Sequence, residues 1–266
     1  MSKLKFPSPG SIYFVVVCVL LYLPIFLLII FSFNDATALV FPLKGFTLKW
    51  YGKLFENREL LRAVGNSVSI GLGSSLIATI LGTMGAIAVV RFKLPGRSAF
   101  LAVAALPLVI PYVILGVSLL VLFNEIGIPL SAFAAGTAHV IISIPYAMLI
   151  VASRLAGFPD NLEEAAMDLG ASYWGALLRV TIPICFPALL AAFLLCFTMS
   201  FDEYAIASFL VGTDATLPVY LYSQLRFPTR LPMVVALAAI LMTVTMAVML
   251  FTEWLRRAGQ ASTRKA

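Results

Sequence analysis

The stretch SIYFVVVCVLLYLPIFLLIIFSF, Ser11–Phe33, runs for 23 residues without an acidic or basic side chain. Five further windows are also free of such charges: 63–90, 98–123, 126–153, 180–201 and 231–252. Each window can supply the roughly 20 apolar residues that a helix needs to cross a bilayer. All are far longer than the strands of a membrane barrel. The windows therefore predict an all-α integral membrane protein with six transmembrane helices.

The composition supports the same prediction. Hydrophobic residues make up 62% of the chain, charged residues make up 11%, and the mean hydropathy is +1.04. A soluble core of this length cannot bury so much apolar surface, so the bilayer is the expected solvent. The net charge of +6 does not indicate a nucleic-acid partner, because the basic residues lie at the ends of the windows. We treat residues 1–266 as a single transmembrane domain.

Three details refine the six predicted helices. The first window is too long for a secretory signal and shows no cleavage site, so we interpret it as a retained helix. Gly127 and Pro129 open the fourth window, which places the start of its helix near Ser131. Pro107 and Pro111 either kink the third helix or only shape its packing.

Basic residues in the short loops predict the orientation of the helices. Lysines 3 and 5, three basic residues in the 91–97 loop, and the basic C-terminal tail fall on one side of a six-helix arrangement. The positive-inside rule places that side, with both termini, in the cytoplasm. The 34–62 loop carries five basic residues and opposes this orientation. Trp50, in that loop, is expected to be an anchor at the membrane interface.

The connection between the fourth and fifth windows is unusually acidic. Four of the chain's 12 acidic residues fall within nine positions of it: Asp160, Glu163, Glu164 and Asp168. The sequence from 161 to 183 is NLEEAAMDLGASYWGALLRVTIP. The acidic side chains either face water, as in a solvated hairpin, or face a partner.

Its local signals predict a helix–turn–helix over residues 159–183. Asp160 and Glu163 form a helix-capping pattern, and Gly170 can end that helix in a left-handed turn. Ser172 can cap a second short helix, which ends before the chain re-enters the bilayer at Pro183. The predicted structure is a compact elbow outside the membrane.

The spacing of this elbow resembles the EAA loop of ABC importer permeases. The family pattern is Glu-Ala-Ala, three residues, Gly, nine residues, then Ile-x-Leu-Pro. The chain has Glu164-Ala165-Ala166, Gly170 and Val180-Thr181-Ile182-Pro183 at the same spacing, with Val180 and Ile182 as conservative departures. In the family this loop docks on an ATPase subunit and transmits its closure. The resemblance implies these ATPase-coupling residues: Glu163, Glu164, Ala165, Ala166, Asp168, Gly170 and Pro183.

The resemblance also implies a fold and a set of partners. The fold is that of a type I importer permease (MetI-like), in the bacterial inner membrane. The implied partners are a second permease subunit forming a heterodimer, two ATP-binding cassette subunits, a periplasmic substrate-binding protein and the lipid bilayer. The sequence contains no Gly-x-x-x-x-Gly-Lys-Ser/Thr loop, so ATP hydrolysis is expected in a partner and the chain is not expected to be an enzyme. We expect no cofactor, no metal and no nucleic acid.

Other stretches narrow the resemblance to one class of importer. GFTLKWYGKLF at 45–55, SRLAGFP at 153–159 and SFDEYAIASFLVGTDATLPVYLYSQL at 200–225 resemble the second permease of spermidine/putrescine importers. Nearly the whole chain is covered. This implies half of a translocation pore for polyamines, and the alternative is a sister importer for opines, amino-acid derivatives or other small solutes. A stand-alone secondary transporter or a membrane-embedded enzyme fits less well, because we find neither inverted repeats nor a paired nucleophile and base.

Three residues are candidates for the substrate pathway: Asp202, Glu203 and Tyr204. Acidic side chains at a membrane boundary are costly unless they are paired or hydrated. They would attract a cationic polyamine, with Tyr204 adding a cation–π face; alternatively they mark where the helix leaves the lipid. The following residues are either a broken segment that lines the pathway or a plain external loop. His139 is expected to be a hydrogen-bonded packing residue with no acidic partner.

Overall fold

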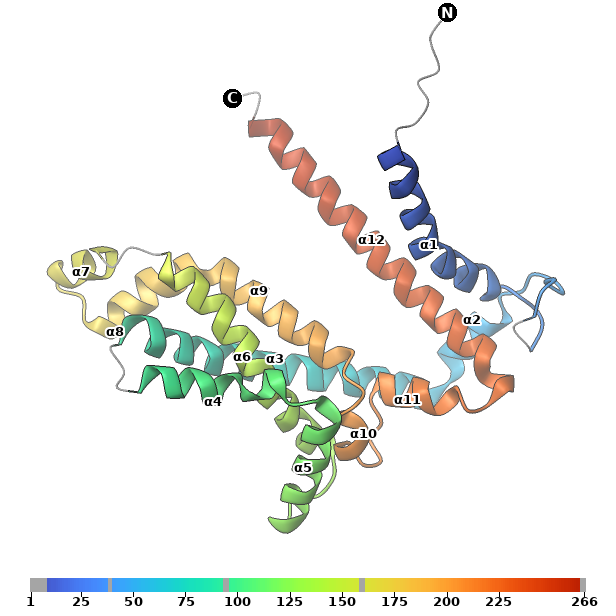
Figure 1. Cartoon of the computed structure of the whole chain (residues 1–266), viewed down its shortest axis with the longest axis horizontal. Helices are drawn as coiled ribbons and strands as arrows, with labels where there is room; N and C mark the ends of the chain where they lie inside the picture. Colours follow the sequence, from blue (N-terminus) through green and yellow to red (C-terminus); the bar gives the residue numbers. More distant parts are fainter. Residues whose placement is uncertain (1–8, 38–39, 93–95, 158–160, 264–266) are drawn as a thin grey trace, which may run out of the picture. The chain divides into compact units, whose positions relative to one another are not determined.

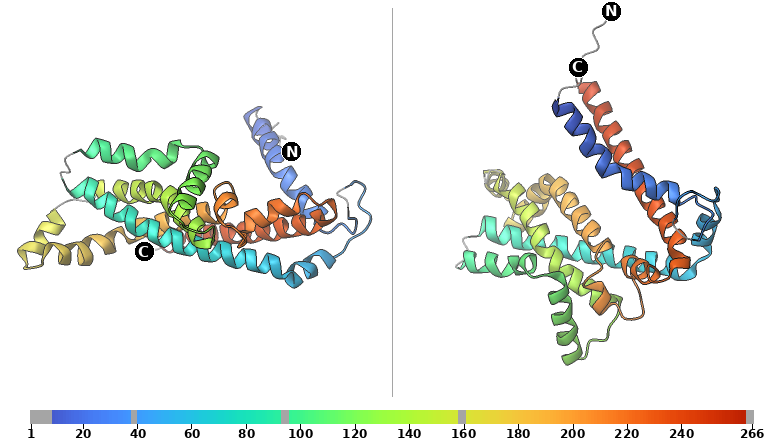
Figure 2. Two further views of the ribbon diagram at one scale, coloured as in Figure 1. Left: turned by 90° about the horizontal axis from the view of Figure 1, so that it is seen from below. Right: turned by 45° about the vertical axis from the view of Figure 1, so that its right-hand side comes forward.

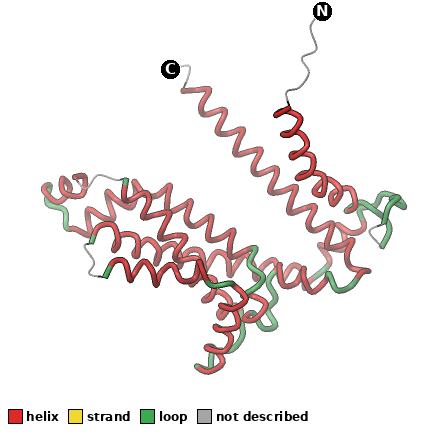
Figure 3. Tube along the Cα trace, viewed as in Figure 1, coloured by secondary structure: helices red, strands yellow, loops and turns green. Residues whose placement is uncertain are grey.

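The computed structural model describes residues 9–37, 40–92, 96–157 and 161–263, with side chains described as far as residue 247. These described residues form helices joined by loops, without a named strand (Figure 3). Five helices are long and apolar enough to cross a membrane, and a bent pair adds a sixth if its two halves are one span. The predicted all-α membrane fold is confirmed. The chain divides into two compact units, which we call the terminal unit (1–58 with 221–266) and the central unit (59–220).

The terminal unit is built on two long helices. In it, α1 (Pro9–Phe31) lies beside α12 (Leu231–Thr263), which also contacts the short α2 (Lys49–Glu56) (Figure 1, Figure 2). A 3-10 turn, η2 (Pro228–Arg230), precedes α12. None of the side chains of α1 is buried within the chain. A helix this apolar therefore presents its surface to lipid or to another subunit.

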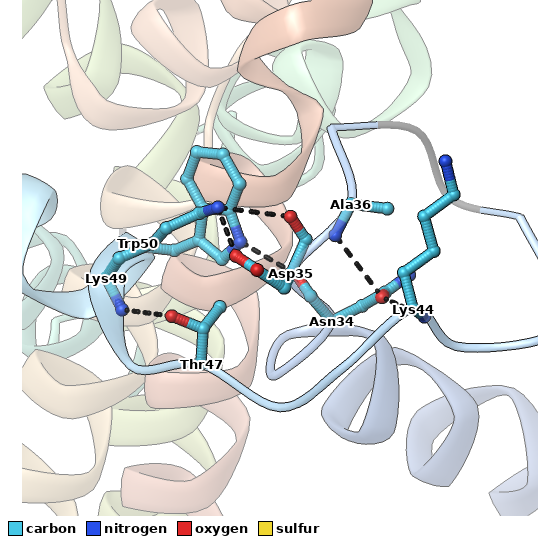
Figure 4. Close-up of polar contacts among 7 residues, drawn as sticks. All are labelled: Asn34, Asp35, Ala36, Lys44, Thr47, Lys49 and Trp50. Atoms are coloured by element: carbon cyan, nitrogen blue, oxygen red, sulfur yellow. Dashed lines mark hydrogen bonds and ion pairs between the residues drawn. The ribbon is translucent and has the colours of Figure 1, made fainter.

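The loop between α1 and α2 is folded on its own hydrogen bonds (Figure 4). Asn34 Oδ1 accepts hydrogen bonds from the backbone N–H groups of Ala36 and Lys44, and Lys49 pairs with Asp35. The indole N–H of Trp50 donates to the Asn34 carbonyl over 2.8 Å, and the Trp50 side chain is only 5% exposed. The prediction that Trp50 is an interfacial anchor is wrong, because its polar N–H is satisfied inside this loop.

Four helices that run alongside one another form the main bundle in the described part of the central unit. They are α3 (Arg58–Arg91, of which 59–91 belong here), α4 (Arg97–Val109), α6 (Ala132–Ala156) and α9 (Ile182–Phe201). The helices run alongside one another (Figure 2), and α6 contacts both α4 and α9. Their shared core contains small side chains such as Ala78, Ala147 and Ala192, each fully buried. Small residues let membrane helices approach closely, so packing rather than bulk apolarity holds this bundle.

The third apolar window is two helices rather than one. α4 ends at Val109, α5 (Tyr112–Glu125) begins after Pro111, and the two helices are bent by 104° at the break. Ile110 has an extended backbone with ψ 126°, as expected for a residue before proline. Pro111 thus breaks the predicted third helix instead of merely kinking it. The helix of the fourth window, α6, starts where the sequence predicts, because Ser131 Oγ caps it by accepting a hydrogen bond from Ala134 N.

Short helices occupy both ends of the central unit. α7 (Asn161–Asp168), α8 (Tyr173–Ala176) and the π-helix η1 (Leu177–Thr181) connect α6 to α9 at one end. α10 (Ala207–Leu210) follows α9 and precedes α11 (Leu217–Gln224), which begins in this unit. The elbow, defined as residues 161–181, and the 202–216 segment lie toward opposite ends of the long helices (Figure 1). These two regions contain the residues predicted to be functional.

Candidate functional sites at the two ends of the bundle

The elbow turns at Gly170. Its N–H donates to the Met167 carbonyl over 2.9 Å, and the N–H of Ala171 donates to the Ala166 carbonyl over 3.0 Å. This pair of bonds ends α7 with φ +91° at Gly170, a conformation that glycine adopts without steric cost. The predicted helix stop is confirmed. Pro159 and Asp160, of the predicted helix start, lie outside the described residues.

The second half of the elbow leads directly into the membrane. Ser172 Oγ accepts a hydrogen bond from Gly175 N over 3.1 Å and caps α8, as predicted. The chain then continues without a break through η1 into α9. Pro183 is exposed near the start of α9, and Thr181 and Ile182 before it already have helical backbone. It therefore does not end the second helix, as the sequence had indicated, but is part of the helix that continues into the span.

The acidic residues of the elbow divide into two kinds. Glu164 and Asp168 are exposed, whereas Glu163 is 7% exposed and is the one buried side chain among the described residues of α7. Glu163 Oε1 lies 3.3 Å from Arg91 Nε and accepts a hydrogen bond from the Thr181 hydroxyl. Glu163 faces the chain itself, because a buried carboxylate needs partners. Its role in coupling to an ATPase stays a prediction.

The elbow also exposes several apolar side chains. Leu169, at the turn, is 90% exposed, and Trp174 is 68% exposed. Leu162 and Met167 are also exposed, and Ala165 lies open between them. Large apolar groups gathered beside charges on one surface are typical of a protein-binding site. Glu164, Asp168 and Leu169 are therefore accessible to a partner.

The second region, residues 202–216, is packed into the bundle. Ile206, Leu210 and Val211 are buried in a core formed with α5 and α6, and the N–H of Ser131 donates to the Leu210 carbonyl. Gly212, with φ +63°, fits against the Leu130 carbonyl. The segment is therefore a broken, internally packed element and not a plain external loop. Irregular backbone of this kind is tolerated at membrane depth where it is buried in protein or lines a cavity.

Glu203 organises this segment. Its two carboxylate oxygens accept hydrogen bonds from the N–H groups of Ile206 and Ala207, each over 2.8 Å. Its Oε2 lies 3.4 Å from Nε2 of the fully buried His139. The expectation that His139 has no acidic partner is wrong, because the turn after α9 brings Glu203 to α6.

The same network extends to α3. His139 Nδ1 lies 2.6 Å from Ser200 Oγ, which lies 3.0 Å from Ser74 Oγ. Sequence reasoning missed Ser74, Ser200 and the pairing of His139, and it placed Arg91 only as a marker of orientation. A lone histidine in an apolar window was the one available signal, since a buried imidazole requires polar neighbours.

The candidate pathway residues are also divided by burial. Asp202 ends α9 and is exposed, Tyr204 is half-buried, and Glu203 is 5% exposed. Because the carboxylate of Glu203 is engaged by protein groups, Asp202 is the acidic residue of the pair that is accessible to a solute.

A bundle of membrane-spanning helices with an exposed acidic elbow defines a membrane-embedded permease subunit. Residues 74–258 match the family described as binding-protein-dependent transport system inner membrane component. The chain belongs to this family. Its members are components of transport systems, which confirms the predicted assignment as a permease of the inner membrane and not an enzyme.

Individual relatives extend the match over most of the chain. The spermidine/putrescine transport system permease protein PotC of Haemophilus influenzae is 36% identical, over 91% of this chain and 94% of the relative. The putrescine transport system permease protein PotI of Escherichia coli K12 is 38% identical, over 84% and 81%. A crystal structure of a bacterial ABC transporter involved in the import of the acidic polysaccharide alginate matches with a TM-score of 0.69 at 18% identity, over 95% of this chain and 99% of that chain. That likeness shows the shared fold.

Proposed function

We propose that the chain forms half of the translocation pathway of an ATP-driven importer for polyamines. The observation that carries the proposal is the similarity, at 34–38% identity, to permeases named for spermidine and putrescine. The exposed carboxylate of Asp202 and the half-buried Tyr204, two residues further along the chain, support a cationic solute, since a carboxylate and an aromatic face both attract an ammonium group.

The elbow is the proposed docking site for an ATPase subunit. Glu164 and Asp168 are exposed charges, Leu169 and Trp174 are exposed apolar groups, and Gly170 fixes the angle between α7 and α8. Such a surface combines the charge that selects a basic partner with the apolar contacts that stabilise the complex. The full importer then contains a second permease subunit, two ATP-binding cassette subunits and a periplasmic substrate-binding protein.

The proposed docking requires the elbow to be cytoplasmic, and with six spans in a single permease domain both termini then lie on the same side. A Ser172→Cys variant in a background without Cys18, Cys185 and Cys196 tests this. Ser172 is exposed, so a membrane-impermeant maleimide will label it in inside-out vesicles and not in intact spheroplasts. Labelling from the outer side would invert the topology and remove the docking proposal.

Uptake by the reconstituted importer tests the substrate. Labelled spermidine is offered to proteoliposomes containing both permeases, the ATPase and the binding protein, in competition with putrescine, opines and amino acids. We expect competition by putrescine alone among these. If opines or amino acids compete and spermidine uptake is absent, the chain serves a sister importer.

A further inference from the structure

A buried ion pair joins the elbow to the end of a membrane helix. Arg91 is the last residue of α3, and its side chain and that of Glu163 are each only 9% exposed. Arg91 Nε and Glu163 Oε1 are 3.3 Å apart. The hydroxyl of Thr181, which is fully buried in the π-helix η1, donates a hydrogen bond to the same carboxylate. Three elements, α3, α7 and η1, therefore meet at one carboxylate.

The position of α7 depends on this contact. A helix of 8 residues is too short to be stable alone, since isolated helices below about 12–15 residues are marginal in water. Tertiary contacts must hold it, yet within the described part of α7 Glu163 is the one side chain that is buried. A buried ion pair also adds little net stability over an apolar pair of similar size. Its use here is best explained by the fixed position that it gives to α7.

Helix α3, whose Arg91 pairs with Glu163, also contacts the 202–216 segment and the residue that follows it. Near the other end of α3, Asn66 Nδ2 donates to the Ala215 carbonyl over 3.1 Å, and Ser67 Oγ accepts from Leu217 N over 2.8 Å. Ser74 joins the network of Ser200, His139 and Glu203. α3 has 34 residues and is therefore about 50 Å long at 1.5 Å per residue. One continuous helix thus contacts both candidate sites.

We propose that Arg91 and Glu163 are positioning residues that attach the elbow to α3, so that displacement of α7 moves α3 and, through it, the 202–216 segment. The inference rests on the proposed docking of the elbow on the ATPase. Glu163 then acts within the chain, and its neighbour Glu164 acts on the partner. The π-helix that contributes Thr181 is consistent with this, because single π-turns occur frequently at functional sites.

The test compares Glu163→Gln with the matched control Glu164→Gln in the complete importer with its ATPase and binding protein. We expect Glu163→Gln to retain the ATPase on co-purification and to import about tenfold less spermidine per ATP hydrolysed, a size typical of coupling between sites. Arg91→Gln should behave in the same way, and the exchange Arg91→Glu with Glu163→Arg should recover part of the loss. Glu164→Gln should instead release the ATPase.

Two outcomes would overturn the inference if the variants insert, and a third would do so if they do not. Loss of the ATPase from Glu163→Gln to the same extent as from Glu164→Gln would make Glu163 a docking residue. An unchanged ratio of spermidine to ATP in Glu163→Gln and Arg91→Gln would make the ion pair structural only. Should these variants fail to insert, Thr181→Val removes only the hydroxyl donor and must lower the same ratio severalfold, or the inference fails. Retention of the ATPase by Glu164→Gln bears on the docking proposal alone.

Discussion

Two pairs of consecutive acidic residues, Glu163–Glu164 in the elbow and Asp202–Glu203 in the 202–216 segment, are divided by burial in the same way. In each pair one carboxylate is buried and bonded to the chain, and its neighbour is exposed. Consecutive residues at a helix end point about 100° apart, so one faces the bundle while the next faces outward. The comparison teaches that neighbouring acids need not form one cluster: one is bonded within the chain, and the other is accessible to a partner or a solute.

The buried members differ in what holds them. Glu163 is paired with the side chains of Arg91 and Thr181, so its contact links separate helices through one ion pair. Glu203 accepts two backbone N–H groups and lies beside His139, so its contacts fix the local backbone. We therefore expect changes at Glu163 to alter coupling, and changes at Glu203 to alter folding of the segment.

The largest expected effect is at Glu203. Glu203→Leu leaves the N–H groups of Ile206 and Ala207 and the His139 ring without their acceptor, and should lower the free energy of unfolding by about 3 to 5 kcal/mol. Thermal denaturation in detergent measures it. Asp202→Leu is the matched control and should stay within about 0.5 kcal/mol. Equal losses for the two variants would show that the pair is not divided by burial.

The next largest effect is at Glu164. If it contacts a basic group of the ATPase, Glu164→Ala should weaken the complex by about 3 kcal/mol, or roughly a hundredfold in Kd, because a desolvated charge loses its partner. Binding of purified ATPase to the permease in nanodiscs measures this. Asp202→Ala, at the other acidic pair, should leave that Kd unchanged. Unaltered binding by Glu164→Ala would favour the alternative that the elbow is a solvated hairpin.

Two glycines with positive φ, Gly212 and Gly170, should respond differently to substitution. A change at Gly212 should mainly lower stability, and a change at Gly170 should mainly lower transport. Alanine at either position adopts an unfavourable positive φ, at about 1 kcal/mol. At Gly212 its Cβ would also lie 2.8 Å from the Leu130 carbonyl, for a total of about 2 to 3 kcal/mol.

At Gly170 no atom beyond the neighbouring residues lies within 4 Å of an added Cβ, so the loss of stability stays small. A residue that avoids positive φ changes the angle between α7 and α8 instead. Gly170→Val should therefore abolish uptake in a protein that still inserts. Gly170→Asn should preserve much of it, since asparagine tolerates positive φ. Thermal denaturation together with uptake distinguishes the two positions, and normal uptake by Gly170→Val would contradict the proposed role of the turn.

The smallest expected effect is at Asp202. Asp202→Asn keeps the shape and removes the charge, and should reduce spermidine uptake about tenfold, near 1.4 kcal/mol, with a smaller reduction for putrescine, which carries less charge. Initial rates with each labelled polyamine measure the difference. Asp214→Asn, an exposed acid of the same segment, is the control. Equal rates in Asp202→Asn and the unaltered chain would make Asp202 a boundary marker.

Local signals in the sequence predicted much of the elbow and of the membrane fold. Long uncharged windows can only be helices in lipid, because every backbone group must be bonded within the span. Gly170 and Ser172 act on their immediate neighbours, so the turn and the second cap were predictable. The break at Pro111 was underestimated, since a proline either kinks or ends a helix according to the packing around it.

The sequence by itself determined the long helices other than the broken third one, the turn at Gly170 and the presence of acidic residues beside the membrane. The tertiary structure alone decided which acid of each pair is buried. Arg91 reaches Glu163, and His139 reaches Glu203, only after α3, α6 and α9 have packed together. Burial of a carboxylate depends on a charge or donor that is distant in the sequence, and no local pattern records that distance.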